Sequence, residues 1–281
     1  MAEDRWVYQK LFVEADRWED ESDRVLVHHV APLSTALRSQ GLIDRVFYLR
    51  YAAGGLHLRH RVRVTDRADV SAVRRALDDA ARSCPSIERA EVADYEPETD
   101  KYGGPDGMEV CERLFDVSSR LALACVEHTT GRRDLRLVVG VWHFDALLAG
   151  HDMVPDLADA ALADYARYWR SLTGVARPGE GQPGPSDRLI AMLSGQLNTS
   201  AAVPDIVEHL VGPELDGCFD DLRDGLAELR AVARARRLTT QLTFILWNLA
   251  HTMNNRLGIP PTNEALVADL LRGAYRARRS R

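Results

Sequence analysis

Basic side chains recur at every second position of the stretch LHLRHRVR, residues 56–63. Alternate side chains of an extended strand point to the same face, so His57, Arg59, Arg61 and Arg63 are expected to lie side by side. Guanidinium groups donate paired hydrogen bonds, which suits them to peptide carbonyls or to an oxyanion that develops during a reaction. The pattern therefore predicts a cationic substrate clamp, although a solvated outer face of a sheet fits it equally well.

A polar loop follows in YEPETDKYGG, residues 95–104. Tyr95, Glu98 and Tyr102 are candidate proton donors or acceptors, and Lys101 is a candidate substrate-binding cation. A positioned acid or base typically accelerates a reaction by roughly a hundred- to ten-thousand-fold. A salt-bridged surface loop that leads into the next helix is the alternative interpretation, and the loop by itself favours that alternative.

A third set of candidates lies near the C-terminus, on a helix that we predict over residues 238–257. Trp247, His251 and Asn255 are spaced four residues apart and share one stripe of this helix, beside Arg256. His251 is a candidate acid or base, and the other three are candidate substrate-binding residues. The alternative is a histidine that packs in the core, which is the commoner role of a lone helical histidine.

The sequence offers no pattern typical of a metal site or a nucleotide site. The four cysteines have no CxxC spacing. His57 and His60 would point to opposite faces of a strand, which is unsuited to shared metal ligation. The chain has no GxGxxG, GKS, GKT or GxSxG motif. We therefore predict neither a metal nor another cofactor.

These candidates require a sheet that carries the arginine strand. Composition and turn residues predict the order β-α-β-β-α-β in the first third of the chain, with Gly54-Gly55 in the hairpin. The expected strands are residues 6–14, 45–51, 56–64 and 86–95, and the expected helices run from Ser22 or Asp23 to Gly41 and over 70–83. This order is the ferredoxin-like split βαβ pattern, an antiparallel sheet behind two helices.

The rest of the chain is expected to be mainly helical, over residues 108–128, 135–148, 156–172, 186–197, 215–236, 238–257 and 262–278. Residues 174–186 are rich in glycine and proline and are expected to form an exposed, mobile loop. The fold class is therefore α+β. We predict a single domain over residues 1–281, with a sheet portion at 1–104 and a helical portion at 105–281.

The composition is that of a globular protein, with 281 residues, 46% hydrophobic and 28% charged. The net charge of −6 argues against a nucleic-acid-binding protein. No apolar signal core follows Met1, and no run approaches the roughly eighteen apolar residues of a membrane span. We expect a cytoplasmic protein with no membrane partner, and the sequence leaves its oligomeric state open.

Three separated stretches resemble the elimination-domain family of lantibiotic dehydratases, and most closely its stand-alone members of thiopeptide-type bacteriocin biosynthesis. They are LRYAAGGLHLRHRV, YEPETDKYGGPDGMEVCERLFDVSS and HTMNNRLG, and they follow the family's order. The resemblance covers most of the chain and implies an elimination-domain-like fold. It also implies an enzyme that acts on a precursor peptide carrying a leader, alongside other enzymes of the pathway.

The resemblance implies one of two reactions, of which the first is glutamate elimination. Such members remove glutamate from glutamylated serine or threonine to leave dehydroamino acids, and their catalytic positions would fall on Arg59, Arg61, Lys101 and His251. The family normally has arginine in place of Lys101, and Asp-Ser in place of Ser118-Ser119. Lysine cannot reproduce a bidentate guanidinium contact, so both differences argue against this reaction.

The second reaction is that of thiopeptide pyridine synthases, which the sequence favours. A formal 4+2 aza-cycloaddition would join two dehydroalanines of an azole-containing precursor peptide, close the macrocycle, and release water and the leader. Arg59 and Arg61 would polarise carbonyls. Protons would be transferred by Tyr95, Glu98, Tyr102 or His251. Substrate binding would fall to His57, Arg63, Lys101, Trp247, Asn255 and Arg256. The alternatives are the glutamate-eliminating half of a split dehydratase and a non-catalytic precursor-peptide-binding subunit.

Overall fold

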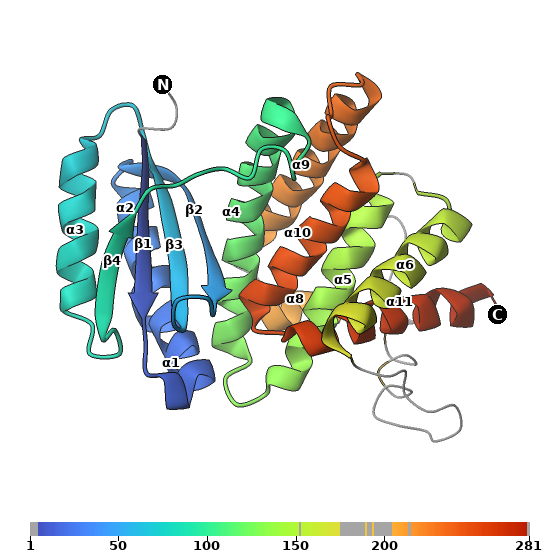
Figure 1. The fold of residues 1–281 in the computed structure, drawn as a ribbon, viewed down its shortest axis with the longest axis horizontal. Coiled ribbons are helices and arrows are strands. Elements are labelled where there is room, and N and C mark those ends of the chain that lie inside the picture. The colour runs from blue at the N-terminus through green and yellow to red at the C-terminus, as the bar shows by residue number, and fades with distance from the viewer. Residues whose placement is uncertain are drawn as a thin grey trace.

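The computed structural model describes residues 5–151, 153–174, 189, 193, 204–212 and 215–279. Figure 1 shows a four-stranded sheet with its helices on one side of the molecule and a larger group of helices on the other. The long helix α4, Gly104–His128, lies between the two and packs against strand β2, Ile43–Tyr51. The sheet therefore borders the helical portion along its β2 edge.

The sheet is antiparallel throughout and has the order β2-β3-β1-β4. Its other strands are β1 (Trp6–Phe12), β3 (His57–Val64) and β4 (Arg89–Ala93). This order confirms the predicted ferredoxin-like pattern, although β4 is shorter than the predicted strand at 86–95. The hairpin between β2 and β3 contains Gly54 and Gly55, whose φ angles of 80° and 104° are open to glycine without steric cost.

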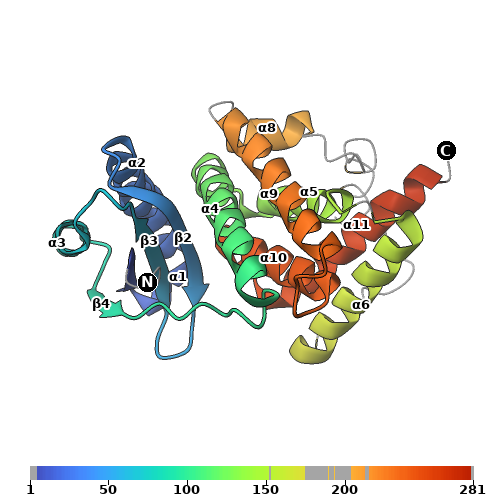
Figure 2. The ribbon, with the colours of Figure 1, turned by 90° about the horizontal axis from the view of Figure 1, so that it is seen from above.

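Helices cover one face of the sheet (Figure 2): α1 (Trp18–Val25), a π-helical turn (Leu26–Val30), α2 (Ala31–Ser39) and α3 (Val70–Arg82). On this face Val62 of β3 lies in an apolar cluster with Leu37 of α2 and Leu77 of α3. The first helix begins at Trp18, before the predicted start at Ser22 or Asp23. Its first turn is acidic, and carboxylates there interact favourably with the positive end of the helix dipole.

The helical portion confirms most of the predicted helices. They are α4, α5 (Arg136–Ala149), α6 (Pro155–Thr173), α9 (Asp216–Arg234), α10 (Leu242–Leu257) and α11 (Glu264–Arg279). A further short helix, α8 (Asp205–Val211), was not predicted. The helix predicted at 186–197 lies almost entirely outside the described residues, and so does the loop predicted at 174–186 beyond Gly174. None of the described helices is both long and apolar enough to cross a membrane.

Helix α10 begins at Leu242, later than the predicted start at residue 238. The backbone N–H of Thr239 donates to the carbonyl of Gly103 over 3.0 Å, so this group is engaged outside the helix. The residues just before α10 thus attach it to the loop that precedes α4. Strand β2 contacts the same helix near its end.

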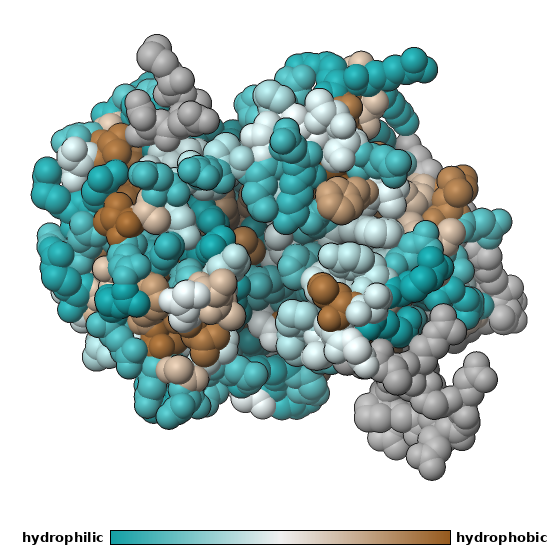
Figure 3. Space-filling model, in the orientation of Figure 1, coloured by the Kyte–Doolittle hydropathy of each residue, from teal (hydrophilic) through white to brown (hydrophobic). Residues whose placement is uncertain are grey.

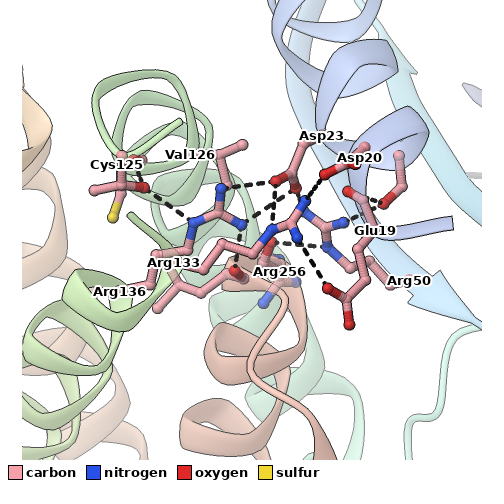
Figure 4. A network of polar contacts seen from close by, with 12 residues as sticks. Glu19, Asp20, Asp23, Arg50, Cys125, Val126, Arg133, Arg136 and Arg256 are labelled. Atoms are coloured by element: carbon pink, nitrogen blue, oxygen red, sulfur yellow. Dashed lines mark hydrogen bonds and ion pairs between the residues drawn. The ribbon is translucent and has the colours of Figure 1, made fainter. Parts of the chain in front are cut away.

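Asp23 of α1 joins the sheet to the helices through a buried network (Figure 4). Its Oδ1 accepts a hydrogen bond from Arg50 of β2 over 2.6 Å, and its Oδ2 accepts one from Arg136 of α5 over 2.7 Å. Arg136 also donates to the carbonyl of Leu257, the last residue of α10, over 3.0 Å. One carboxylate therefore links α1, β2, α5 and, through Arg136, α10.

Burial raises the pKa of Asp23, but the positive charges of Arg50 and Arg136 outweigh this effect, and the net pKa lies below its ordinary value. The carboxylate is therefore ionised throughout the neutral range. Removing it would leave two buried guanidinium groups without their main partner, and such losses are strongly destabilising.

We expect Asp23→Asn to lower the free energy of unfolding by roughly 3–5 kcal/mol, because it leaves buried positive charge without compensation. Chemical denaturation followed by circular dichroism measures this loss. Asp20→Asn is the control, because Asp20 is exposed and pairs with Arg133 alone, and it should cost under about 0.5 kcal/mol. Equal losses in the two variants would contradict a special role for Asp23.

The lowered pKa of Asp23 also predicts a pH dependence. A carboxyl group with a depressed folded-state pKa contributes stability in full above its unfolded pKa of about 3.9 and loses it as the pH falls through the folded pKa. The wild type should therefore lose stability more steeply than Asp23→Asn as the pH is lowered below about 4. Denaturation curves recorded over this range test the difference, and identical slopes would contradict it.

Candidate active site

Strand β3 places its alternate side chains as the sequence predicts. Arg61 lies opposite Tyr8 of β1 and Phe47 of β2, and Arg59 lies opposite Lys10 of β1. This face is turned away from α2 and α3, whose apolar residues pack on the other side of the sheet. Figure 1 looks onto it, with residues 95–104 crossing in front towards α4. In the same view Figure 3 shows an indentation between the sheet and the helices.

Arg61 is buried and forms no ion pair within the described part of the chain. Its residue is 7% exposed, and its guanidinium carbon lies 4.4 Å from the ring centroid of Tyr8, 5.4 Å from Phe47 and 5.3 Å from Tyr95. Among the described residues no carboxylate forms an ion pair with it, and its Nε has no hydrogen-bond partner. Burial lowers the pKa of Arg61. Three aromatic rings thus offset only part of the cost of burying this charge.

Two further cations on the same face also lack an ion-pair partner among the described residues. Lys10 and Arg59 face each other across β1 and β3, where like charges repel, and Glu91 of β4, opposite Lys10 on its other side, offsets part of this repulsion. Arg59 stacks on Tyr51, with 3.2 Å between its guanidinium carbon and the ring centroid, and its Nε is unpartnered. An anionic ligand over this face would relieve the repulsion.

The two ends of the arginine strand differ from its middle. His57 is buried, its Nδ1 lies 2.7 Å from the carbonyl oxygen of Gly55, and burial lowers its pKa, so it is uncharged at neutral pH. Arg63 forms two hydrogen bonds with Asp44, which raises its pKa and neutralises its charge. Unpaired charge on β3 is therefore confined to Arg59 and Arg61.

The loop at 95–104 supplies one wall of the site. Tyr95 donates its hydroxyl proton to Glu112 of α4 over 2.9 Å, and burial raises its pKa, so its proton is committed to that contact. Burial likewise raises the pKa of Tyr102, which is 1% exposed. Glu98 is exposed and lies 3.4 Å from Lys101 Nζ. Among the predicted site residues of the loop, Glu98 thus has exposed proton-accepting atoms.

The two glycines that end this loop position it against α10. Gly103 has φ 86°, and a Cβ there would lie 2.8 Å from side-chain atoms of both Leu238 and Ile245. Gly104 has φ 87°, and a Cβ there would lie 3.0 Å from Thr239. Because Gly103 and Gly104 have no side chains, the residues before α10 can pack directly against the backbone of this loop.

Two candidates on α10 have structural partners. Asn255 Oδ1 accepts from the backbone N–H of Arg50 over 2.8 Å, and its Nδ2 donates to the Arg50 carbonyl over 2.9 Å. Arg256 is 1% exposed and donates from Nε to Ser119 over 2.9 Å, while its Nη1 has no partner among the described residues. Burial lowers the pKa of Arg256 to about 10. Asn255 thus fastens α10 to β2 through both atoms of its amide group.

His251 lies one turn earlier on α10 and has a buried partner. Its Nδ1 lies 2.8 Å from Oε1 of Glu264, the first residue of α11, and its ring stacks on Trp169 with 4.7 Å between centroids. The His251 side chain is 30% exposed, whereas Glu264 is fully buried. Trp247 is half-buried beside Tyr165, with 5.8 Å between ring centroids.

The predicted site residues thus form two groups. Electrostatic interactions connect Arg61 with Tyr95, Glu98, Tyr102 and Arg256. The second group is His251 and Trp247 on α10. Helix α10 joins the sheet through Asn255, but within the described residues no hydrogen bond or ion pair connects His251 with β3. The described residues also contain no group of three His, Cys, Asp or Glu side chains suited to a metal ion.

The sequence interpretation missed two residues of the site, Lys10 and Glu264. Lys10 lies on β1, and the sequence alone does not show which residue of β3 it pairs with. The register of the sheet places it opposite Arg59. Glu264 is 13 residues from His251 in the chain and comes from a different helix. The available signal was a glutamate near the start of a predicted helix. Carboxylates are common at that position because they interact favourably with the helix dipole, so the signal does not indicate a site.

The family model for the lantibiotic biosynthesis dehydratase C-terminus matches residues 6–275. The chain belongs to this family. The match spans nearly the whole chain and confirms the resemblance carried by the arginine strand, the YGG loop and the HTMNNRLG stretch. No curated protein sequence matches the chain significantly.

Three solved structures share the fold. The tRNA-dependent lantibiotic dehydratase MibB from Microbispora sp. 107891 matches with a TM-score of 0.73 and 22% identity, over 100% of this chain and 29% of MibB. TsrL matches with a TM-score of 0.61 and 19% identity, over 98% of this chain and 95% of TsrL. The pyridine synthase TbtD from thiomuracin biosynthesis matches with a TM-score of 0.54 and 15% identity, over 97% of this chain and 98% of TbtD. The chain thus spans under a third of MibB but nearly all of TsrL and TbtD.

We expect Arg61→Met to leave the free energy of unfolding unchanged or to raise it by up to roughly 2 kcal/mol, because it removes a buried charge that has no counter-ion. Arg136→Met is the matched comparison, since its charge is buried but paired with Asp23, and it should cost roughly 3 kcal/mol. Chemical denaturation measures both. A loss in Arg61→Met as large as that in Arg136→Met would assign Arg61 a structural role.

Proposed function

We propose that this chain removes glutamate from glutamylated serine or threonine residues of a precursor peptide. The observation that carries this proposal is the buried Arg61, which forms no ion pair among the described residues, beside Arg59 and Lys10. Proteins rarely keep a buried charge unpaired unless a ligand completes the pair. The sequence favours cycloaddition, but this charge distribution suits an anionic substrate better.

The chemistry of the elimination explains why positive charge is needed. A base removes the proton from Cα of the modified residue, the Cβ–O bond breaks, a C=C bond forms between Cα and Cβ, and glutamate leaves as a carboxylate. Negative charge therefore grows on the departing carboxyl group in the transition state. Whichever carboxyl group forms the ester, the other one remains free, so the bound substrate already carries an anion. Preorganised guanidinium donors stabilise both charges.

Proton transfer falls to the groups with accessible lone pairs. The Tyr95 hydroxyl donates a hydrogen bond to Glu112, and burial raises the pKa of both Tyr95 and Tyr102, so both phenols stay protonated and cannot take a proton from the substrate. Glu98 and His251 are the predicted candidates that keep an exposed portion. We assign the base to His251 and a substrate-orienting role to Lys101 with Glu98.

The likeness to MibB supports this proposal, since a lantibiotic dehydratase shares the fold over the whole chain. The elimination acts on a peptide that already carries the glutamyl ester, so a glutamyl-transferring enzyme must supply it. That enzyme and the precursor peptide are the proposed partners.

A second candidate is the pyridine synthase reaction, the formal 4+2 cycloaddition of two dehydroalanines. Two observations favour it. The chain covers nearly the full length of TbtD, a pyridine synthase, and Lys101 occupies the position where the eliminating members carry arginine. In that reaction Arg59 and Arg61 would polarise peptide carbonyls rather than bind a carboxylate.

Mass spectrometry of two substrates separates these reactions. The protein is incubated with a peptide carrying glutamylated serine and, separately, with an azole-containing peptide carrying two dehydroalanines and its leader. Loss of glutamic acid from the first supports the elimination. Release of the leader from the second, with a dehydrated macrocycle, supports the synthase and overturns the elimination.

Variants of the arginine strand test the roles of its residues. We expect Arg61→Gln to lower turnover by at least roughly a hundredfold, as loss of a preorganised charge donor does. Arg63→Gln is the matched control on the same strand and face, because Asp44 already neutralises Arg63, and it should change turnover by less than about threefold. If neither peptide is converted but both bind, and Arg61→Gln weakens that binding, the chain is a precursor-binding subunit and the catalytic proposal is wrong.

A further inference from the structure

Three hydrogen-bond donors converge on the carboxylate of Glu264, which is 0% exposed. Asn254 Nδ2 donates to Oε2 over 2.6 Å, and the Tyr165 hydroxyl donates to the same oxygen. His251 Nδ1 lies 2.8 Å from the other oxygen, Oε1. An ionised carboxylate can only accept hydrogen bonds, and buried carboxylates are stable when several donors surround them.

This arrangement restricts the imidazole of His251. Because Asn254 and Tyr165 both occupy Oε2, Oε1 is left for the histidine, and Nδ1 must carry the proton to donate to it. In the neutral ring the lone pair is then on Nε2. The ring of Trp169, stacked at 4.7 Å and tilted by 32°, restricts rotation of the imidazole plane. The exposed part of the side chain lies away from the buried Glu264.

We propose that Glu264 is a positioning residue that holds His251 in the Nδ1–H tautomer, so that Nε2 accepts the substrate proton. When that proton arrives, Nε2 becomes N–H and the ring becomes an imidazolium, while Glu264 stays ionised and stabilises the new positive charge through its contact with Nδ1. Tyr165 and Asn254 hold the carboxylate in place. This inference deepens the proposed function and rests on it, because it assumes that His251 is the base.

The alternative is that Glu264 only anchors the start of α11 against α6 and α10. Both roles require a buried, hydrogen-bonded carboxylate, so loss of stability on substitution does not distinguish them. Turnover does, because a positioning role predicts a loss of kcat in Glu264→Gln that an anchoring role does not. A measurement on the free protein first tests, without any substrate, whether Glu264 controls the tautomer of His251.

We expect ¹⁵N-edited NMR of histidine-labelled protein, with the His251 signal assigned by its loss in His251→Gln, to show one neutral tautomer protonated at Nδ1. In Glu264→Gln the amide presents either an oxygen or an NH₂ group to the ring, so both tautomers should appear. Asp269→Asn is the matched control, because it breaks the α6–α11 ion pair with Arg170 without touching His251, and it should keep the single tautomer. A wild-type ring protonated at Nε2, or a single Nδ1–H tautomer in Glu264→Gln, would overturn the proposal.

Kinetics with the peptide that is converted give the second readout. Glu264→Gln should lower kcat by at least about tenfold, as part of the roughly hundred- to ten-thousand-fold that a positioned base contributes, and leave KM within about threefold. Asp269→Asn should change neither. If neither peptide is converted, the proposed function fails while the tautomer measurement still decides whether Glu264 controls the tautomer of His251. A rise in KM with unchanged kcat would contradict a positioning role.

Discussion

The geometry of the candidate site depends on the ion pairs of Asp23. Its carboxylate accepts hydrogen bonds from Arg50 of β2 and Arg136 of α5, and Arg136 continues to the end of α10 at Leu257. Asn255 adds a second link, because its amide group bonds to the backbone of Arg50. These contacts fix the helix that carries His251 against the sheet that carries Arg61. Both portions of the chain are thereby fastened by polar contacts whose loss would leave buried charges unpaired.

Arg61 differs from most of the buried arginines nearby. Arg45 pairs with Glu112, and Arg50 and Arg136 pair with Asp23, whereas Arg256 resembles Arg61 in forming no ion pair within the described part of the chain. Arg61 has three aromatic rings instead, and it shares its face with the opposed cations Lys10 and Arg59. A fold selected for stability alone would place apolar side chains there. The arrangement is therefore better explained by an anion that binds transiently than by the needs of the fold.

His251 shows a different arrangement, in which Nδ1 of the imidazole has a buried carboxylate partner. Glu264 uses both oxygens, and Trp169 packs against the imidazole ring. A group that transfers a proton repeatedly benefits from a fixed orientation. A group that binds an anion benefits from hydrogen-bond donors that have no partner in the free protein. Under the proposed function, the two groups of the site would serve two different tasks in one reaction, charge stabilisation on β3 and proton transfer on α10.

The sequence by itself determined the local features of this protein. The alternation of LHLRHRVR placed Arg59 and Arg61 on one face, Gly54-Gly55 specified the hairpin, and the order of elements specified the ferredoxin-like sheet, because these signals act between residues close in the chain. Only the tertiary structure decided which charges are neutralised. Asp44 removes Arg63 from the set of free cations, Asn255 turns out to fasten a helix, and Glu264 joins His251 from another helix. Such partners come from elements distant in sequence, and their pairing follows from how the helices and strands pack, which no local pattern encodes.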